Sequence, residues 1–384
     1  PVERGFDHHY GTIVGGGSYF WPRTMVRDFE SLEQQVRDTP DFYYTDAISD
    51  ETVGFIERHA AEHPDRPFFQ YVAYTAPHWP LHAREEDIAR YKGRFDAGWD
   101  VLRTQRRERM VDMGLIDERW KLSARDPAVP GWDYEPERTK AWQRRRMEVY
   151  AAQIDRMDQG IGRILDALER TGRLDNTLVI FLADNGGCSE DFGPTMDLTK
   201  PAWARAETRD GRPVVGGNNP GIMPGPVDTF QSYGVGWANV SNTPFRLYKH
   251  WAHEGGISTP FIAHWPAGLA ARGELRRQAA YLPDVMATVL DITGAEYPRK
   301  FAGESIPPCE GVSLTPALEG RELPERMMFW EHEGNAAVRE GKWKLVLNFA
   351  AVPTGKRFHG DERGDWELYD VESDRTELRN IASQ

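Results

Sequence analysis

The stretch TLVIFLADNGG, residues 177–187, decides the fold class of this chain. Its first six residues are almost entirely apolar and do not alternate with polar ones, which is typical of a strand covered on both faces of its sheet. The preceding residues 148–170 carry one apolar stripe at helical spacing, and Gly172 is placed to end that helix. A helix, a short loop and a buried strand form one arm of a layered α/β fold.

Other segments extend this alternation in both directions. Apolar residues at three- and four-residue spacing predict helices over 46–63 and 282–292. Short apolar or aromatic runs predict buried strands over 67–74 and 260–265. The sequence therefore favours several helices layered on a sheet of short strands.

Three segments are expected to lie outside the core. Residues 83–140 are dense in charge and contain three prolines, which favours an exposed, partly helical insertion. Residues 188–241 hold many Gly, Pro and Trp residues without a clear period, as in a long surface loop. From about residue 325, short strands alternate with turns and predict a small α+β subdomain over 325–384.

Composition excludes several classes of protein. The 384 residues carry a net charge of −13, so bulk attraction to nucleic acid or to an anionic membrane is disfavoured. No run of about eighteen apolar residues occurs, and no membrane span is expected. Cys188 and Cys309 are the only cysteines, too few for a disulfide framework. An anionic substrate would need a local cluster of cations.

Asp184 and Asn185 follow the buried strand directly, at the strand end where α/β proteins gather ligands. Carboxylate and amide oxygens are hard ligands that suit Ca²⁺ or Mg²⁺. The alternative is an Asx turn that closes the strand, since Asn-Gly is a common turn pair.

His78 and His82 follow the other strong strand, on a loop with prolines on both sides. They could act as acid/base groups or bind an anion, and a packed histidine is the alternative for either one.

A cluster of cations lies further along the chain. Arg246, Lys249, His250 and His253 are close enough in sequence to meet one bound oxyanion, although a solvated basic surface would give the same pattern. His332, in the tetrapeptide Glu-His-Glu-Gly, is a weaker candidate that also fits a surface turn.

Taken together, these segments resemble sulfatases of the arylsulfatase type, in the alkaline phosphatase superfamily. The resemblance runs almost end to end and rests on the order of five motifs: GFDHHYG (5–11), APHWP (76–80), LADNGG (182–187), KHWAHEGG (249–256) and WELYD (366–370). It implies a three-layer α/β/α core with a large mixed sheet over residues 1–324, including the insertion 83–140, and a small C-terminal subdomain.

The resemblance also implies roles for individual residues. Asp184 and Asn185 match a pair of metal ligands, usually to Ca²⁺ and less often to Mg²⁺. His78 matches a histidine that contacts the bridging oxygen of a sulfate ester and assists departure of the leaving group. Lys249 matches the lysine that grips the sulfate. Such roles agree with the physics, because fixed charges that stabilise the transition state are usually the largest catalytic contribution.

Three further residues are expected to bind substrate from the cation-rich segments around the same site. They are Arg246, His253 and His332.

The chain departs from the family in one respect. The family nucleophile is a formylglycine made from Cys or Ser in a Cys/Ser-x-Pro-x-Arg motif, and these 384 residues contain no such motif. Cys188 is followed by Ser-Glu-Asp, and Cys309 by Glu-Gly-Val. The family's first acidic metal pair is also missing, and these parts normally precede the segment that matches 5–11. We therefore expect the chain to lack an N-terminal part, supplied by the same protein or by a second chain, and to have little activity alone.

The expected function is that of a sulfuric ester hydrolase, with a sulfated carbohydrate preferred over a small sulfate ester. One alternative is a phosphodiester or phosphonate monoester hydrolase of the same superfamily, since the same cations serve phosphoryl transfer. Another is a non-catalytic relative that binds sulfoglycans. Because related sulfatases are often exported, a periplasmic or extracellular location is expected.

Overall fold

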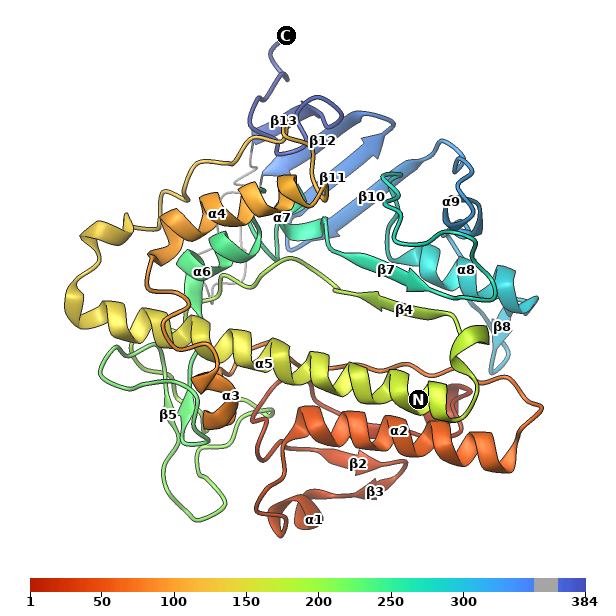
Figure 1. The fold of residues 1–384 in the computed structure, drawn as a ribbon, viewed down its shortest axis with the longest axis horizontal. Helices are drawn as coiled ribbons and strands as arrows, with labels where there is room; N and C mark the ends of the chain where they lie inside the picture. The colour runs from red at the N-terminus through yellow and green to blue at the C-terminus, as the bar shows by residue number, and fades with distance from the viewer. Residues whose placement is uncertain (349–364) are drawn as a thin grey trace.

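The computed structural model describes residues 1–348 and 365–384 (Figure 1). The α-helices are α1 (Glu33–Arg37), α2 (Tyr44–Glu62), α3 (Glu85–Ala89), α4 (Gly98–Asp112), α5 (Glu137–Arg170), α6 (Gly234–Ser241), α7 (Glu254–Ile257), α8 (Pro283–Thr293) and α9 (Thr315–Leu318). The strands are β1 (Tyr10–Thr12), β2 (Met25–Arg27), β3 (Glu30–Ser31), β4 (Val179–Leu182), β5 (Val215–Gly216), β6 (Thr229–Phe230), β7 (Phe261–His264), β8 (Lys300–Phe301), β9 (Glu304–Ser305), β10 (Met327–His332), β11 (Asn335–Glu340), β12 (Trp343–Asn348) and β13 (Asp365–Asp370).

Two long helices, α2 and α5, lie side by side across the molecule (Figure 1). Ile56 of α2 and Leu168 of α5 are buried in one cluster, as the predicted apolar stripes require. Gly160 permits the close approach, because a Cβ at this position would collide with the Ser49 side chain. The structure confirms both helices and the end near Gly172, but α5 starts eleven residues before the predicted position. Its first three turns are mostly polar and lack a stripe that would reveal them.

The strands β4 and β7 form an antiparallel pair beside α5, with Leu182 opposite Phe261 (Figure 1). Both strands were expected. The large mixed sheet was not found: among residues 1–348 and 365–384, β4 and β7 form a sheet of two strands, with no further strand hydrogen-bonded to either. Residues 67–74 were expected to form another strand, and they do not belong to any sheet of the described chain.

The segment 67–74 nevertheless behaves like a strand without neighbours. Its side chains alternate between exposed and partly buried along the whole length. Phe68 packs on the α2–α5 cluster, while Phe69 and Tyr71 are 62% and 75% exposed. Because a strand is stabilised by hydrogen bonds to a neighbour, an isolated extended segment leaves its edges unpaired.

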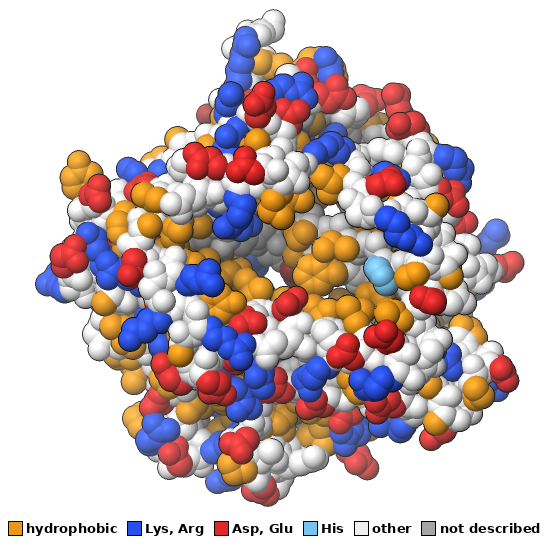
Figure 2. Space-filling model, viewed as in Figure 1, with side chains coloured by type: hydrophobic (Ala, Val, Ile, Leu, Met, Phe, Trp, Pro, Cys, Tyr) orange, Lys and Arg blue, Asp and Glu red, His pale blue; other side chains and the backbone are white. Residues whose placement is uncertain are grey.

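The middle layer, which is the β4–β7 pair, exposes further apolar surface. Ile262 of β7 is 58% exposed, and no residue of β4 is fully buried. Figure 2 shows hydrophobic side chains around a hollow in the middle of this face of the molecule. Contiguous exposed apolar surface on a soluble protein usually marks a place where something else packs.

Residues 83–140 are less exposed than expected. Trp99 of α4 and Trp132 are almost fully buried, and both rings pack edge-on or tilted against Trp237 of α6. The prediction of an exposed excursion was wrong for these aromatic residues. Their burial could not be predicted from this charge-rich sequence, because the few apolar residues that face the core do not form a regular stripe.

The C-terminal part contains a four-stranded antiparallel sheet in the order β10-β11-β12-β13. It confirms the predicted strands after residue 325, and residues 349–364 of the expected subdomain lie outside the described residues. The boundary between 324 and 325 stays a prediction. In the part of the chain that the structure describes, no helix combines the length and the apolar character needed to cross a bilayer.

Candidate active site

The candidate site forms where the turn after β4 meets residues 247–256. The amide N–H of Gly186 donates to the carbonyl of Gly256 at 2.9 Å, and that of Lys249 donates to Gly187 at 3.1 Å. The Asn242 side chain joins both segments, because its Oδ1 accepts from the Gly187 amide and its Nδ2 donates to the Gly255 carbonyl, each at 2.8 Å. Sequence reasoning missed Asn242, which lies more than fifty residues from the turn that it holds.

Two glycine pairs make this contact possible. A Cβ on Gly186 would overlap the carbonyl oxygen of Gly255, and a Cβ on Gly256 would overlap that of Trp251. The sequence showed the glycines as turn formers, whereas the structure shows that they allow two backbones to touch.

We expect Gly186→Ala to lower the free energy of unfolding by about 2 kcal/mol, because the new Cβ must push two hydrogen-bonded segments apart. Urea unfolding measures the effect. Gly162→Ala is the matched control, since a Cβ there, in α5, meets no atom within 4 Å. It should leave stability unchanged or raise it by up to about 1 kcal/mol. Equal effects of the two substitutions would contradict the close contact.

His78 and Lys249 come together at the centre of the site. The Lys249 ammonium lies 3.4 Å from His78 Nε2 and can donate to it. The other ring nitrogen, Nδ1, contacts the Trp79 carbonyl at 2.9 Å, so it carries the hydrogen that donates there. Burial lowers the pKa of His78, and the Lys249 charge lowers it further. The ring is therefore neutral near pH 7, and its Nε2 lone pair faces the cation.

Glu190 organises the cations of the site. Its Oε1 lies 3.5 Å from Lys249 Nζ and accepts from His250 Nε2 at 3.1 Å, and its other oxygen accepts from Trp79. Burial alone would raise the pKa of Glu190, but the hydrogen bond from His250 and the charge of Lys249 hold it well below its usual value. No sequence pattern pointed to this residue, because its partners lie about sixty and over a hundred positions away.

Asp184 and Asn185 lie at the end of β4, beside these groups. Asp184 is exposed and Asn185 partly buried, and neither side chain makes a hydrogen bond or an ion pair with any residue that the structure describes. Two unpartnered oxygen donors on one turn fit the hard-ligand set of Ca²⁺, which takes six to eight oxygens. The chemistry of the pair suits such a site, and its role in binding a metal stays a prediction.

Arg246 and His253 turn away from His78 toward strand β13. Arg246 lies 3.0 Å from Glu367 Oε2, and the fully buried His253 lies 2.8 Å from the same oxygen. Burial opposes ionisation of Glu367, but the His253 and Tyr369 hydrogen bonds and the Arg246 charge lower its pKa to about 2. These contacts join the site segment to the C-terminal sheet, and substrate binding by Arg246 and His253 stays a prediction.

His332 lies nearer the site. His332 is the last residue of β10, and its ring stacks on that of His250 with centroids 5.4 Å apart. His250 in turn contacts Glu190, so His332 reaches the Lys249–Glu190 pair through a single intervening side chain, that of His250.

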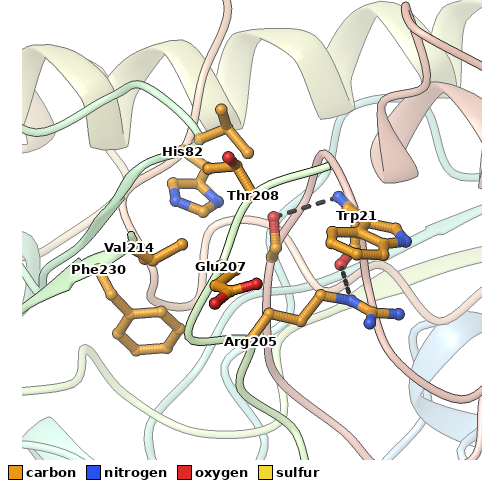
Figure 3. Close-up of a pocket in the computed structure, with 9 residues that line it drawn as sticks. Trp21, His82, Arg205, Glu207, Thr208, Val214 and Phe230 are labelled. Carbon is orange, nitrogen blue, oxygen red and sulfur yellow. Dashed lines mark hydrogen bonds between the residues drawn. The ribbon is translucent and has the colours of Figure 1, made fainter. Parts of the chain in front are cut away.

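His82 takes the packed alternative that the sequence left open. It is 1% exposed, accepts from the Tyr19 amide and donates to the Thr229 carbonyl at 2.6 Å. Burial lowers its pKa to about 4. Figure 3 shows its ring beside a small pocket that Phe230 and Arg205 also line. The space inside this pocket is about 10 Å³. That volume holds one water molecule at most, so this pocket is not a substrate site.

Cys188 is the cysteine nearest to this site. Burial, and to a lesser extent the nearby Glu190 charge, raises the pKa of its thiol to about 12. A thiol that stays protonated at neutral pH is a poor nucleophile. The structure therefore gives no reason to assign Cys188 the role of the missing nucleophile.

The amino-acid sequence of the chain is similar to those of known sulfatases. The model of the sulfatase family matches residues 2–295. An uncharacterized sulfatase of Schizosaccharomyces pombe is 31% identical over 100% of this chain and 68% of its own length. An arylsulfatase of Klebsiella aerogenes is 32% identical over 82% of this chain and 66% of its own length.

Solved structures give the same fold. The crystal structure of Ps i-CgsB matches 100% of this chain and 64% of its own, with a TM-score of 0.58 at 20% identity. Its complex with k-i-k-neocarrahexaose matches with a TM-score of 0.55. The chain thus spans about two thirds of the length of these relatives. The matches confirm the family and the α/β architecture, and they do not support the expected loss of an N-terminal part, which stays a prediction.

Proposed function

Since the chain belongs to the sulfatase family, we propose that it hydrolyses sulfate esters at the site formed by His78, Lys249, Asp184 and Asn185. The observation that carries the proposal is the 3.4 Å contact between Lys249 Nζ and His78 Nε2, next to two unpartnered oxygen ligands. The site thus offers a fixed cation for an anionic group and an imidazole nitrogen for proton transfer.

Each residue has a separable task in this proposal. Lys249 binds sulfate oxygens, and Glu190, 3.5 Å from its ammonium, helps to hold it in place. His78 is oriented by the Trp79 carbonyl, so Nε2 is the atom that can hold a proton for the leaving alkoxide. A proton shared with Lys249 compensates for the lowered pKa of His78, which would otherwise leave that nitrogen bare near pH 7.

Asp184 and Asn185 would hold a divalent ion, Ca²⁺ in preference to Mg²⁺. Such an ion supplies positive charge that polarises the sulfate group. The two residues leave most of its coordination sphere open to water, substrate or other protein groups.

The nucleophile is proposed to be a formylglycine from polypeptide outside these 384 residues. Such a residue would supply the oxygen that attacks sulfur. The open middle layer supports the proposal, since the exposed apolar side chains of 67–74 and β7 leave room for further β-structure. It follows that the 384 residues alone should show little turnover.

The proposed substrate is a sulfated carbohydrate. Ps i-CgsB, which shares its fold with this chain, has been solved in complex with k-i-k-neocarrahexaose. Around His78, Trp79 packs against Trp203 with centroids 5.1 Å apart, which places aromatic surface of the kind that stacks on sugar rings close to the site. A periplasmic or extracellular location remains part of this proposal.

Sulfate release by the protein isolated from its native source tests the proposal. We expect release from a sulfated oligosaccharide to be faster than from an aryl sulfate, phosphodiester or phosphonate monoester. Intact-mass and peptide-sequence analysis of the same sample should show a formylglycine-x-Pro-x-Arg peptide in a longer chain or in a bound second chain. Faster cleavage of a phosphorus ester would favour the phosphohydrolase alternative. Binding of the oligosaccharide without turnover, with that peptide present, would favour a binding protein.

A further inference from the structure

A second cluster of ligating side chains lies next to the sulfate site, where the β10–β11 turn meets the segment after Lys249. We propose that His250, His332 and Glu333 bind a divalent transition-metal ion of the Zn²⁺ type. Their ligand atoms all lie within 4.8 Å of one another. His332 and Glu333 are on an exposed turn, so a small shift brings each atom to the distance of about 2.0–2.1 Å that Zn²⁺ requires.

The hydrogen-bond partners of His250 prepare one of its nitrogens for a metal. Nε2 donates its hydrogen to Glu190, which in turn is fixed by Trp79. In the neutral ring, Nδ1 then carries a lone pair, and it faces Glu333 Oε2 inside the cluster. A carboxylate that fixes the tautomer of a ligating histidine from its far side is the usual support of such metal sites.

The charges around this cluster favour a cation over an anion. Glu333 Oε2 lies 2.9 Å from His250 Nδ1, and Glu190 lies on the other side of the ring. Two carboxylates on the two ring nitrogens attract a positive charge to this ring, which a second proton or a bound metal ion can supply. Two imidazoles and one carboxylate are donors that select Zn²⁺ and its neighbours rather than Ca²⁺, which prefers oxygen alone.

The backbone at two of the three ligands is held in an unusual conformation. His250 has φ 87° and Glu333 has φ 51°, in the left-handed region that favours glycine. Gly334 follows Glu333, so the two-residue turn would accept Asn or Gly at the first position without strain. Non-glycine residues kept in this region often serve a function that needs their side chains.

A metal here would connect the C-terminal sheet to the catalytic segment. Glu190 contacts both His250 and Lys249. An ion bound to His250 would therefore change the electrostatic environment of the Lys249 ammonium through this shared carboxylate. The proposal does not depend on the proposed hydrolase activity, because metal binding is measured without substrate.

The test is a titration of the chelator-treated chain with Zn²⁺ by calorimetry and with Co²⁺ by visible absorption, both in excess Ca²⁺ to occupy oxygen-only sites. We expect one equivalent to bind, with a Co²⁺ spectrum that shows nitrogen ligands. His332→Ala and Glu333→Gln should each weaken Zn²⁺ binding at least about tenfold. Glu190→Gln, which removes the tautomer support, should weaken it by about 10- to 100-fold.

Control variants exclude adventitious binding. His8→Ala removes another exposed histidine, 3.6 Å from Asp28, and His59→Ala breaks the contact between His59 of α2 and the exposed His63 just beyond it. Both should bind Zn²⁺ like the unmodified chain. Absence of binding, or binding that is lost in a control and kept in His332→Ala and Glu333→Gln, would overturn the proposal. Thermal unfolding of each apo variant verifies that the exposed turn can be changed without loss of the fold.

Discussion

Replacing Lys249 with alanine is expected to lower kcat/KM for sulfate-ester hydrolysis by about 10²- to 10³-fold, the usual loss when one group that stabilises developing charge is removed. Lys249 is the cation in contact with His78, so the substitution removes both the sulfate contact and the proton donor for Nε2. Because Glu190 then loses a positive partner, part of the effect should appear as weaker substrate binding. Steady-state kinetics of sulfate release by the complete, active protein measure both parts.

The control for this prediction is Lys200→Ala. Lys200 is 83% exposed and pairs only with Asp197 at the surface, so kcat/KM should stay unchanged. A Lys249→Ala protein that keeps kcat/KM within threefold of the original would show that another group binds the sulfate.

Replacing Lys344 with alanine is expected to lower the free energy of unfolding by about 3–5 kcal/mol, the range for breaking a buried ion pair. The Lys344 side chain of β12 is fully buried and lies 2.7 Å from Glu254 and 2.8 Å from Glu377. Its removal leaves these carboxylates without the cation at their centre, although Arg375 still pairs with Glu254. Urea unfolding followed by circular dichroism measures the change.

Lys342→Ala is the matched control on the same sheet. Lys342 pairs with Asp370 at 3.1 Å, but its side chain is 44% exposed, so its loss should cost less than about 1 kcal/mol. Since Glu254 belongs to the segment that carries Lys249, Lys344→Ala should also reduce activity more than Lys342→Ala. A loss below about 1 kcal/mol for Lys344→Ala would contradict the view that this buried charge fastens the C-terminal sheet to the site.

The parts of the fold that sequence could predict depend on neighbours along the chain. The apolar stripe of residues 148–170 and the apolar run before Asp184 are local patterns, and both elements are present. The turn Asp184–Gly187 and the Lys249–Gly256 segment were predicted as separate site segments, and their glycines are the reason that they pack together.

The rest depends on contacts that no local pattern encodes. Trp99 and Trp132 pack against Trp237 of α6, more than a hundred residues later in the chain, so their charge-rich surroundings suggested exposure instead. Residues 67–74 have the composition of a strand, but a strand forms only where a neighbour supplies hydrogen bonds. The large sheet was inferred from the family resemblance, and the described chain holds two strands of this layer.

In the candidate site, too, some residues could be predicted from local motifs and others only from the structure. His78 and Lys249 could be chosen from the motifs that carry them, and the structure brings them within 3.4 Å. Glu190 could not be chosen, because its importance comes from Trp79, Lys249 and His250 around it. Arg246 and His253 belong to the same cation-rich segment as Lys249, yet the backbone between them turns their side chains toward Glu367.

A crystal structure with Ca²⁺ and a slowly hydrolysed sulfate ester tests the central claim most directly. We expect the ion to contact the side-chain oxygens of Asp184 and Asn185. The sulfate group should lie within hydrogen-bond distance of Lys249 Nζ, with the bridging ester oxygen next to His78 Nε2. A sulfate ester bound at Arg246 and His253, with Asp184 and Asn185 free of metal at saturating Ca²⁺, would contradict the site described for this chain.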